Sequence, residues 1–270
     1  MVSWARLATY NQTVQWQQFN SLVSLTAYEL WRTRWPWLVF GVVVGAYALA
    51  EFAASLAVTE SAAYRVVCYA ASVRLGLVAA LSLLVMVNTV RDLDDYFLDL
   101  MLSRPLDRRL WVAAKFTGYG CASMLAAAVA CLPLCLISPP AAALGWGFTL
   151  ACELMLVSAA ALTAALSLAH VTLAFCAVSG FYLLSRAMQA VVVLSRDALL
   201  APVTLMQRAL AWSVQSLSYC LPDLARYTQS AWLIYAPPSR ADLQFVVTET
   251  LLYGGLLLVV GMLDFQRRNF

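Results

Sequence analysis

The side chains in this sequence most able to do chemistry are ionisable groups that interrupt long apolar runs. Glu153, Glu51 and Arg74 are of this kind, and so is Arg186. A charge at the centre of a membrane helix costs about 2.5–3.5 kcal/mol, so such a residue marks a functional position by default. Glu153 is the candidate to face a transport pathway or a partner helix, with structural pairing as the alternative. Glu51 could pair with Arg74, and we expect both arginines to reach towards the outer membrane surface.

Other groups that could react are isolated from one another. Cys131 and Cys135 lie four residues apart on one helix face and could hold a soft metal, but no histidine or further cysteine accompanies them. His170, the only histidine, is predicted to be a turn residue. The sequence also lacks a Gly-x-x-x-x-Gly-Lys-Ser/Thr loop for binding phosphates. We therefore expect no catalytic residue, no metal site and no cofactor bound by this chain.

A stretch between the second and third apolar runs combines acidic, aromatic and basic residues. Asp92 begins the first turn of a predicted short helix, where negative charge is favoured by the helix dipole, and Pro105 ends it. The apolar face of this helix consists of Tyr96, Phe97, Leu100 and Met101. Its charged rim consists of Asp94, Asp95, Arg104, Arg108 and Arg109. The pattern predicts an amphipathic helix over about 92–104, with a plain solvated loop as the alternative.

The elements that must position these residues are membrane helices. The chain is 63% hydrophobic and 11% charged, against roughly 45–50% and about 25% in soluble domains. Each membrane helix needs about 20 mostly apolar residues, because lipid offers no hydrogen-bond partners to the backbone. The predicted spans are 37–57, 66–90, 110–137, 145–169, 171–194 and 243–263. The predicted fold is an all-α integral membrane protein with six transmembrane helices.

Two further segments flank or interrupt the spans. Residues 14–31 place apolar side chains at spacings of three and four, which is typical of an amphipathic helix in the membrane interface. We therefore divide the chain into an amino-terminal segment, 1–36, and a transmembrane domain, 37–270. Residues 195–241 form an external segment with re-entrant or surface helices. Gly41 and Gly45 form a small-xxx-small pattern, which predicts helix or subunit packing in the first span.

Basic residues near the span ends indicate the orientation, because cytoplasmic flanks are enriched in them. Most lie in the amino-terminal segment, in the connection after the second span and in the carboxy-terminal tail. Both termini are therefore expected to be cytoplasmic. The net charge of +3 is too small an excess to indicate a nucleic-acid partner.

One stretch begins at Asp94-Asp95, continues through Ser103-Arg104-Pro105-Leu106-Asp107-Arg108-Arg109, and ends at Lys115-Phe116-Thr117-Gly118. This stretch resembles the corresponding part of membrane subunits of ABC-2-type ABC transporters. Ser218-Tyr219-Cys220-Leu221-Pro222-Asp223 is similar to a Leu-Pro-Asn-like stretch of the family's external segment, and Gln266-Arg267-Arg268-Asn269 is similar to its basic ending. The interfacial helix, six spans and external helices also match that family.

The resemblance implies a function that the chain performs with partners. Residues 92–104 would be the coupling helix, whose apolar face docks into a separate ABC ATPase subunit that binds ATP and Mg. The chain would form a homodimer in the bacterial cytoplasmic (inner) membrane, in contact with membrane lipids. A periplasmic or external protein is a further candidate partner.

Two alternatives remain at this point. The chain could be a transport-inactive, mechanotransmitting membrane anchor that recruits a protein partner through residues 195–241. It could also be an intramembrane enzyme, but that class requires paired catalytic groups at membrane depth. Only the isolated Glu153 and Glu51 are candidates for such groups.

Overall fold

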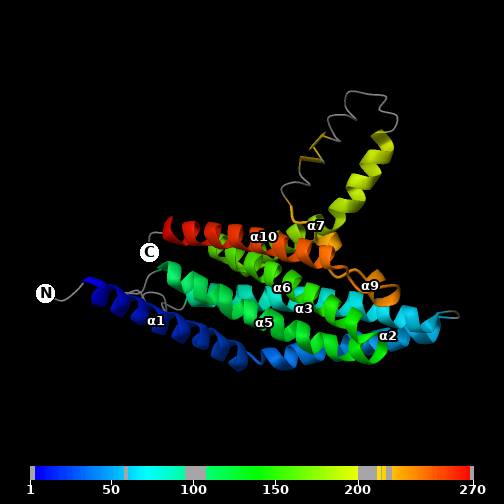
Figure 1. The fold of residues 1–270 in the computed structure, drawn as a ribbon, viewed down its shortest axis with the longest axis horizontal. Coiled ribbons are helices and arrows are strands. Elements are labelled where there is room, and N and C mark those ends of the chain that lie inside the picture. Colours follow the sequence, from blue (N-terminus) through cyan, green and yellow to red (C-terminus); the bar gives the residue numbers. More distant parts are fainter. Residues whose placement is uncertain are drawn as a thin grey trace.

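The computed structural model describes residues 4–57, 60–94, 108–199, 212–213, 215–216 and 221–267, without the side chains of residues 4–15, 108 and 192–199. These residues form an all-α protein (Figure 1). The long helices are α1 (Trp4–Arg32), α2 (Trp35–Leu56), α3 (Ser61–Asp94), α5 (Arg108–Ile137), α6 (Pro140–Leu168), α7 (Val171–Leu199) and α10 (Arg240–Arg267). Two short elements, η1 (Leu224–Arg226) and α9 (Ala231–Ile234), precede α10.

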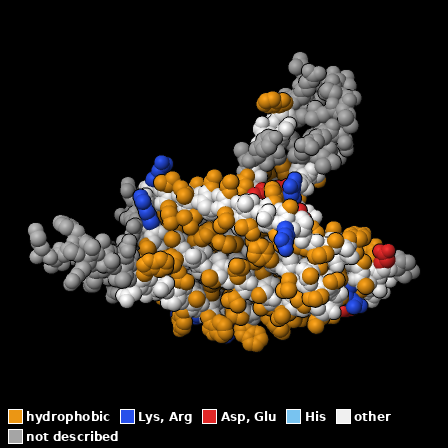
Figure 2. Space-filling view, in the orientation of Figure 1, with side chains coloured by type: hydrophobic (Ala, Val, Ile, Leu, Met, Phe, Trp, Pro, Cys, Tyr) orange, Lys and Arg blue, Asp and Glu red, His pale blue; other side chains and the backbone are white. Residues whose placement is uncertain are grey.

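Among the described residues, six helices are long and apolar enough to cross a membrane, and they make the chain a multi-pass membrane protein. They are α2, α3, α5, α6, α7 and α10. Each predicted span falls on one of them, with ends that agree to within about one and a half helical turns. The expected six-span, all-α fold is therefore confirmed. Figure 2 shows hydrophobic side chains over the middle of the bundle, as expected for a surface in contact with lipid.

Helix α6 is the centre of the bundle. It packs against α3, α5, α7 and α10, and most of its side chains are buried, with Trp146 and Leu154 fully enclosed. Such a helix is apolar around most of its circumference, because most of its surface meets other helices. A buried polar side chain on α6 is therefore held by protein groups and not by lipid or water.

Short turns place helices that are consecutive in the sequence side by side. Helices α2 and α3 pack together, and a Cβ added at Gly76 would lie 2.7 Å from Val42, so a glycine at this position permits the close approach. Helices α6 and α7 are joined at Ala169, which has a left-handed φ of 52°, and at the exposed His170. The predicted tight turn at His170 is confirmed.

Helix α1 lies along α5 (Figure 1) and buries Leu22, Thr26 and Leu30. A Cβ added at Gly118 would lie 2.7 Å from Thr26, so the two helices touch closely here. The predicted helix over 14–31 is thus present as part of α1. The first turn of α1 and the last turn of α10 lie at the same end of the bundle (Figure 1).

The part of the external segment that contains η1 and α9 lies on the bundle. The short η1 contacts α7, and α9 contacts α3 and α6. The carboxy-terminal part of α7 leaves the bundle and projects away from it (Figure 1). The predicted helices over 198–221 fall largely outside the described residues, apart from helical positions at 212–213 and 215–216.

Candidate functional site

Glu153 is the centre of a buried polar cluster. Its side chain is 0% exposed, and its position on α6 places it among α3, α7 and η1. Oε1 accepts hydrogen bonds from the Tyr182 hydroxyl at 2.8 Å and from Nη1 of Arg186 at 3.1 Å. Oε2 accepts one from the Thr228 hydroxyl at 2.6 Å. A buried carboxylate is tolerated only when its oxygens are paired in this way.

Thr228 brings the external segment into the cluster. Its backbone N–H donates to the hydroxyl of Thr149 at 3.3 Å, and its carbonyl accepts from Nη1 of Arg74 at 3.4 Å. Nη1 of Arg186 also donates to the Leu224 carbonyl, at 3.0 Å. Thr228 has a φ of 42°, a left-handed conformation that is strained for a β-branched residue. The surrounding hydrogen bonds hold this conformation in place.

The rest of the segment is fixed to α10. The Tyr227 hydroxyl donates to the Val246 carbonyl at 3.2 Å, and the Asp223 N–H donates to Oε1 of Glu249 at 2.8 Å. Burial raises the pKa of Tyr227 above its ordinary value, so its hydroxyl stays protonated and available as a donor. Residues 221–228 therefore form a clamp, which we call the outer clamp, across α6, α7 and α10.

A second cluster lies at the other end of α3. The ammonium of Lys115, the only lysine in the chain, lies 2.5 Å from Oε2 of Glu29 and 2.7 Å from Oδ2 of Asp92. The Lys115 side chain is 3% exposed, and the Trp111 ring lies 5.7 Å from its ammonium. This lysine node joins α1, α3 and α5 by charge. Breaking a buried ion pair of this kind by removing one partner costs about 3–5 kcal/mol.

The lysine node adjoins the predicted coupling helix. Asp94 ends α3 and is exposed, Arg108 begins α5, and the exposed Arg109 lies beside the Gln266 amide of α10. Six predicted residues lie outside the described residues, namely Asp95, Tyr96, Phe97, Leu100, Met101 and Arg104. The structure nevertheless describes α3 and α5, the helices on either side of this segment, and the lysine node holds them together.

The suggested pairing of Glu51 was wrong. Glu51 pairs with Arg65 at 3.2 Å and not with Arg74. Both partners lie near the loop of the α2–α3 hairpin, about one and a half turns from it, so they face each other. Arg74 and Arg186 are bound inside the cluster by the Thr228 carbonyl and the Glu153 carboxylate. Their expected reach towards the outer membrane surface stays a prediction.

The predicted glycine packing is absent inside the described chain. Gly41 and Gly45 are exposed on α2, and nothing lies within 4 Å of a Cβ added at either position. Their role in packing against a second copy stays a prediction. Cys131 and Cys135 have Sγ atoms 3.8 Å apart, and the described residues contain no group of three or more metal-binding side chains.

Sequence reasoning missed the lysine node and Thr228. Lys115 was an available signal, since a lysine inside a predicted span requires a carboxylate partner, and Glu29 and Asp92 each lie next to apolar runs. Thr228 carried no such signal, because a threonine in a polar segment is ordinary.

Comparisons of the chain with protein-family models and with curated proteins gave no match.

Proposed function

We propose that this chain is the transmembrane subunit of an ABC-2-type transporter. It would work as a homodimer with a separate ABC ATPase that binds ATP and Mg and drives substrate across the membrane. The observation that carries the proposal is the continuity of α3, which contributes Asp92 to the lysine node and Arg74 to the Glu153 cluster. These residues are roughly 27 Å apart along the helix axis at 1.5 Å per residue.

This arrangement supports coupling between the two ends of the bundle. A partner that displaces residues 92–104 would move the ends of α3 and α5, which the lysine node ties to α1. Because α3 is one uninterrupted helix, its displacement would reach Arg74 and the outer clamp. Rigid-body movement of packed helices is a standard means of such transmission. The ion pair at Asp92 and the hydrogen bond from Arg74 to the Thr228 carbonyl would keep α3 from sliding independently of its neighbours.

The proposal includes a location and an orientation. The chain would lie in the bacterial cytoplasmic membrane with both termini and residues 92–104 in the cytoplasm. The positions of the α1 and α10 ends on one side of the bundle support a common side for the termini (Figure 1). Carboxy-terminal fusions to a reporter that is active only in the cytoplasm and to one active only outside should separate the two orientations.

The test of the function is retention of the ATPase. The double variant F97A/L100A removes two large side chains from the predicted docking face, so the tagged chain should insert normally but lose most of the ATP hydrolysis that co-purifies with it. The matched control is L256A/L263A, which truncates two exposed leucines of α10. Equal ATP hydrolysis in both double variants would contradict the assignment.

One observation favours a second candidate, the mechanotransmitting anchor. The end of α7 projects from the bundle (Figure 1), and Trp212 and Tyr235 are exposed in the segment between α7 and α10. Exposed aromatic side chains are common in protein interfaces. ATP hydrolysis in the complex that responds to an external protein, and not to small substrates, would favour this candidate.

A further inference from the structure

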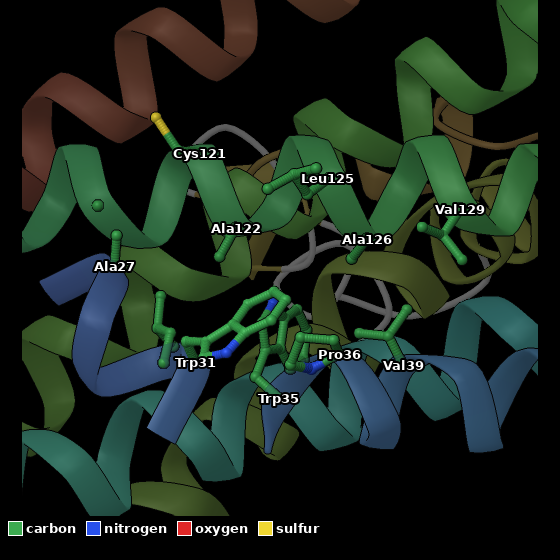
Figure 3. Close-up of a pocket in the computed structure, with 12 residues that line it drawn as sticks. Ala27, Trp31, Trp35, Pro36, Val39, Cys121, Ala122, Leu125, Ala126 and Val129 are labelled. Atoms are coloured by element: carbon green, nitrogen blue, oxygen red, sulfur yellow. The ribbon is translucent and has the colours of Figure 1, made fainter. Parts of the chain in front are cut away.

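The elbow between α1 and α2 creates a groove against α5. Arg34 has a left-handed φ of 57° and breaks the helix, and Pro36 starts α2 in its first turn. The two helices therefore meet α5 from different directions, and a space remains where they separate from it. Figure 3 shows Trp31, Trp35 and Pro36 at this elbow, facing the side of α5 that carries Ala122 and Ala126.

The groove is apolar and has a volume of about 300 Å³. Leu30, Trp35 and Val39 line it from the elbow side, while Ala126 and Val129 line it from α5. Small side chains on α5 leave the space open. Along α5 the lining runs from Gly118 to Val129, which is roughly 16 Å of helix at 1.5 Å per residue. This elongated, apolar shape suits a hydrocarbon chain.

One mouth of the groove carries positive charge. A neighbouring hollow is lined by Arg34, Trp37 and Phe40, and it shares Trp31 and Pro36 with the groove. Arg34 is exposed, and within the described residues its guanidinium has no ion-pair partner. The nearby carboxylate of Glu29 is already bound to Lys115. The apolar groove thus ends beside Arg34, whose positive charge is available to bind an anion.

The aromatic residues at this mouth place it at headgroup depth. Trp31 and Trp37 are each 73% exposed. Exposed tryptophans are typical of the membrane–water interface, where the ring meets hydrocarbon and the N–H meets water. A guanidinium at that depth matches a phosphate with two parallel N–H donors. The apolar groove can therefore bind a hydrocarbon chain, and Arg34 beside it can bind a phosphate.

We propose that the elbow binds one anionic glycerophospholipid, with its phosphate at Arg34 and one acyl chain in the groove between α2 and α5. The positive charge of Arg34 at this mouth favours a net-anionic headgroup over a zwitterionic one. The site needs only the six-span fold, so it is independent of the proposed transport function.

The first test compares two arginines. The purified chain in detergent is titrated with phosphatidylglycerol or phosphatidylcholine, and bound lipid is counted by native mass spectrometry. The wild-type chain should retain phosphatidylglycerol at lower concentrations than phosphatidylcholine. R34Q should reduce this preference about fivefold, whereas R32Q, which changes an arginine outside both hollows, should keep it. An equal loss in R34Q and R32Q would indicate a general surface-charge effect and overturn the site.

The second test concerns the acyl chain. Leu125 lines the groove, and Leu132 lies farther along the same helix outside it, and both are 65% exposed. L125W should obstruct the groove and weaken binding of both lipids, while L132W should leave binding unchanged. Equal lipid binding in L125W and L132W would overturn the proposal. A loss of dimer in L125W with unchanged lipid binding would also overturn it, because a second copy would then fill the groove.

Discussion

Replacing Lys115 with methionine gives the sharpest prediction about the lysine node. The variant removes the ammonium between Glu29 and Asp92 and keeps an unbranched apolar side chain in its place. Removing one partner from a buried ion pair costs about 3–5 kcal/mol. The lower limit applies here, because the Glu29 side chain is 26% exposed and the Asp92 side chain 14% exposed. We expect a loss of about 3 kcal/mol.

This cost corresponds to a measurable shift in thermal unfolding. A loss of 1 kcal/mol in the free energy of unfolding lowers the midpoint temperature by about 2–4 °C in chains of this size class. K115M should therefore unfold about 6–12 °C below the wild type. Intrinsic tryptophan fluorescence in detergent micelles is a suitable readout, because Trp111 lies 5.7 Å from the ammonium. The matched control is R91M, which removes an exposed basic residue of α3 and should change stability by no more than about 0.5 kcal/mol.

A triple variant separates charge pairing from packing. K115M/E29Q/D92N removes all three charges, so no buried carboxylate is left without its ammonium. Replacing every member of a buried ionic group is often neutral, unlike removing one member. The triple variant should therefore recover most of the lost stability. An unchanged midpoint in K115M, or a triple variant less stable than K115M, would refute the assignment of Lys115 as the charge that joins α1, α3 and α5.

Three further variants test other contacts. E153Q keeps the shape of the side chain but removes its charge, so thermal unfolding should show a loss of about 1.5–3 kcal/mol, and limited proteolysis should cut the outer clamp faster. G118V forces α1 away from α5 at Thr26, and the elbow should then become accessible to protease; unchanged cleavage would contradict the close packing. E51Q should cost no more than about 1 kcal/mol, because Glu51 and Arg65 are both partly exposed, and a larger midpoint shift would show a stronger pair.

The six spans were predictable because lipid imposes a strict requirement on length and composition. A run of about 20 apolar residues has few other structures available to it, so α2, α3, α5, α6, α7 and α10 could be placed from sequence. The turn at His170 followed from the short distance between two apolar runs. Local constraints of this kind do not depend on how the helices pack.

The pairings between helices were not predictable in the same way. The sequence suggested Arg74 as a partner for Glu51, but the α2–α3 hairpin places Glu51 beside Arg65. The hydrogen bond from Arg186 to the Leu224 carbonyl of the external segment was likewise not predicted. The rotation of each helix about its axis decides which polar groups meet inside the bundle. That rotation depends on tertiary contacts that one sequence does not reveal.

The proposed dependence of this chain on a nucleotide-driven partner can be tested by purifying the tagged protein from its own membranes in mild detergent. Mass spectrometry identifies the proteins that accompany it, and ATP hydrolysis is measured on the same sample with Mg present. We expect a P-loop ATPase in equal amount and ATP hydrolysis that is lost in the F97A/L100A variant. A purified chain with no nucleotide-hydrolysing companion would contradict the proposed role of residues 92–104.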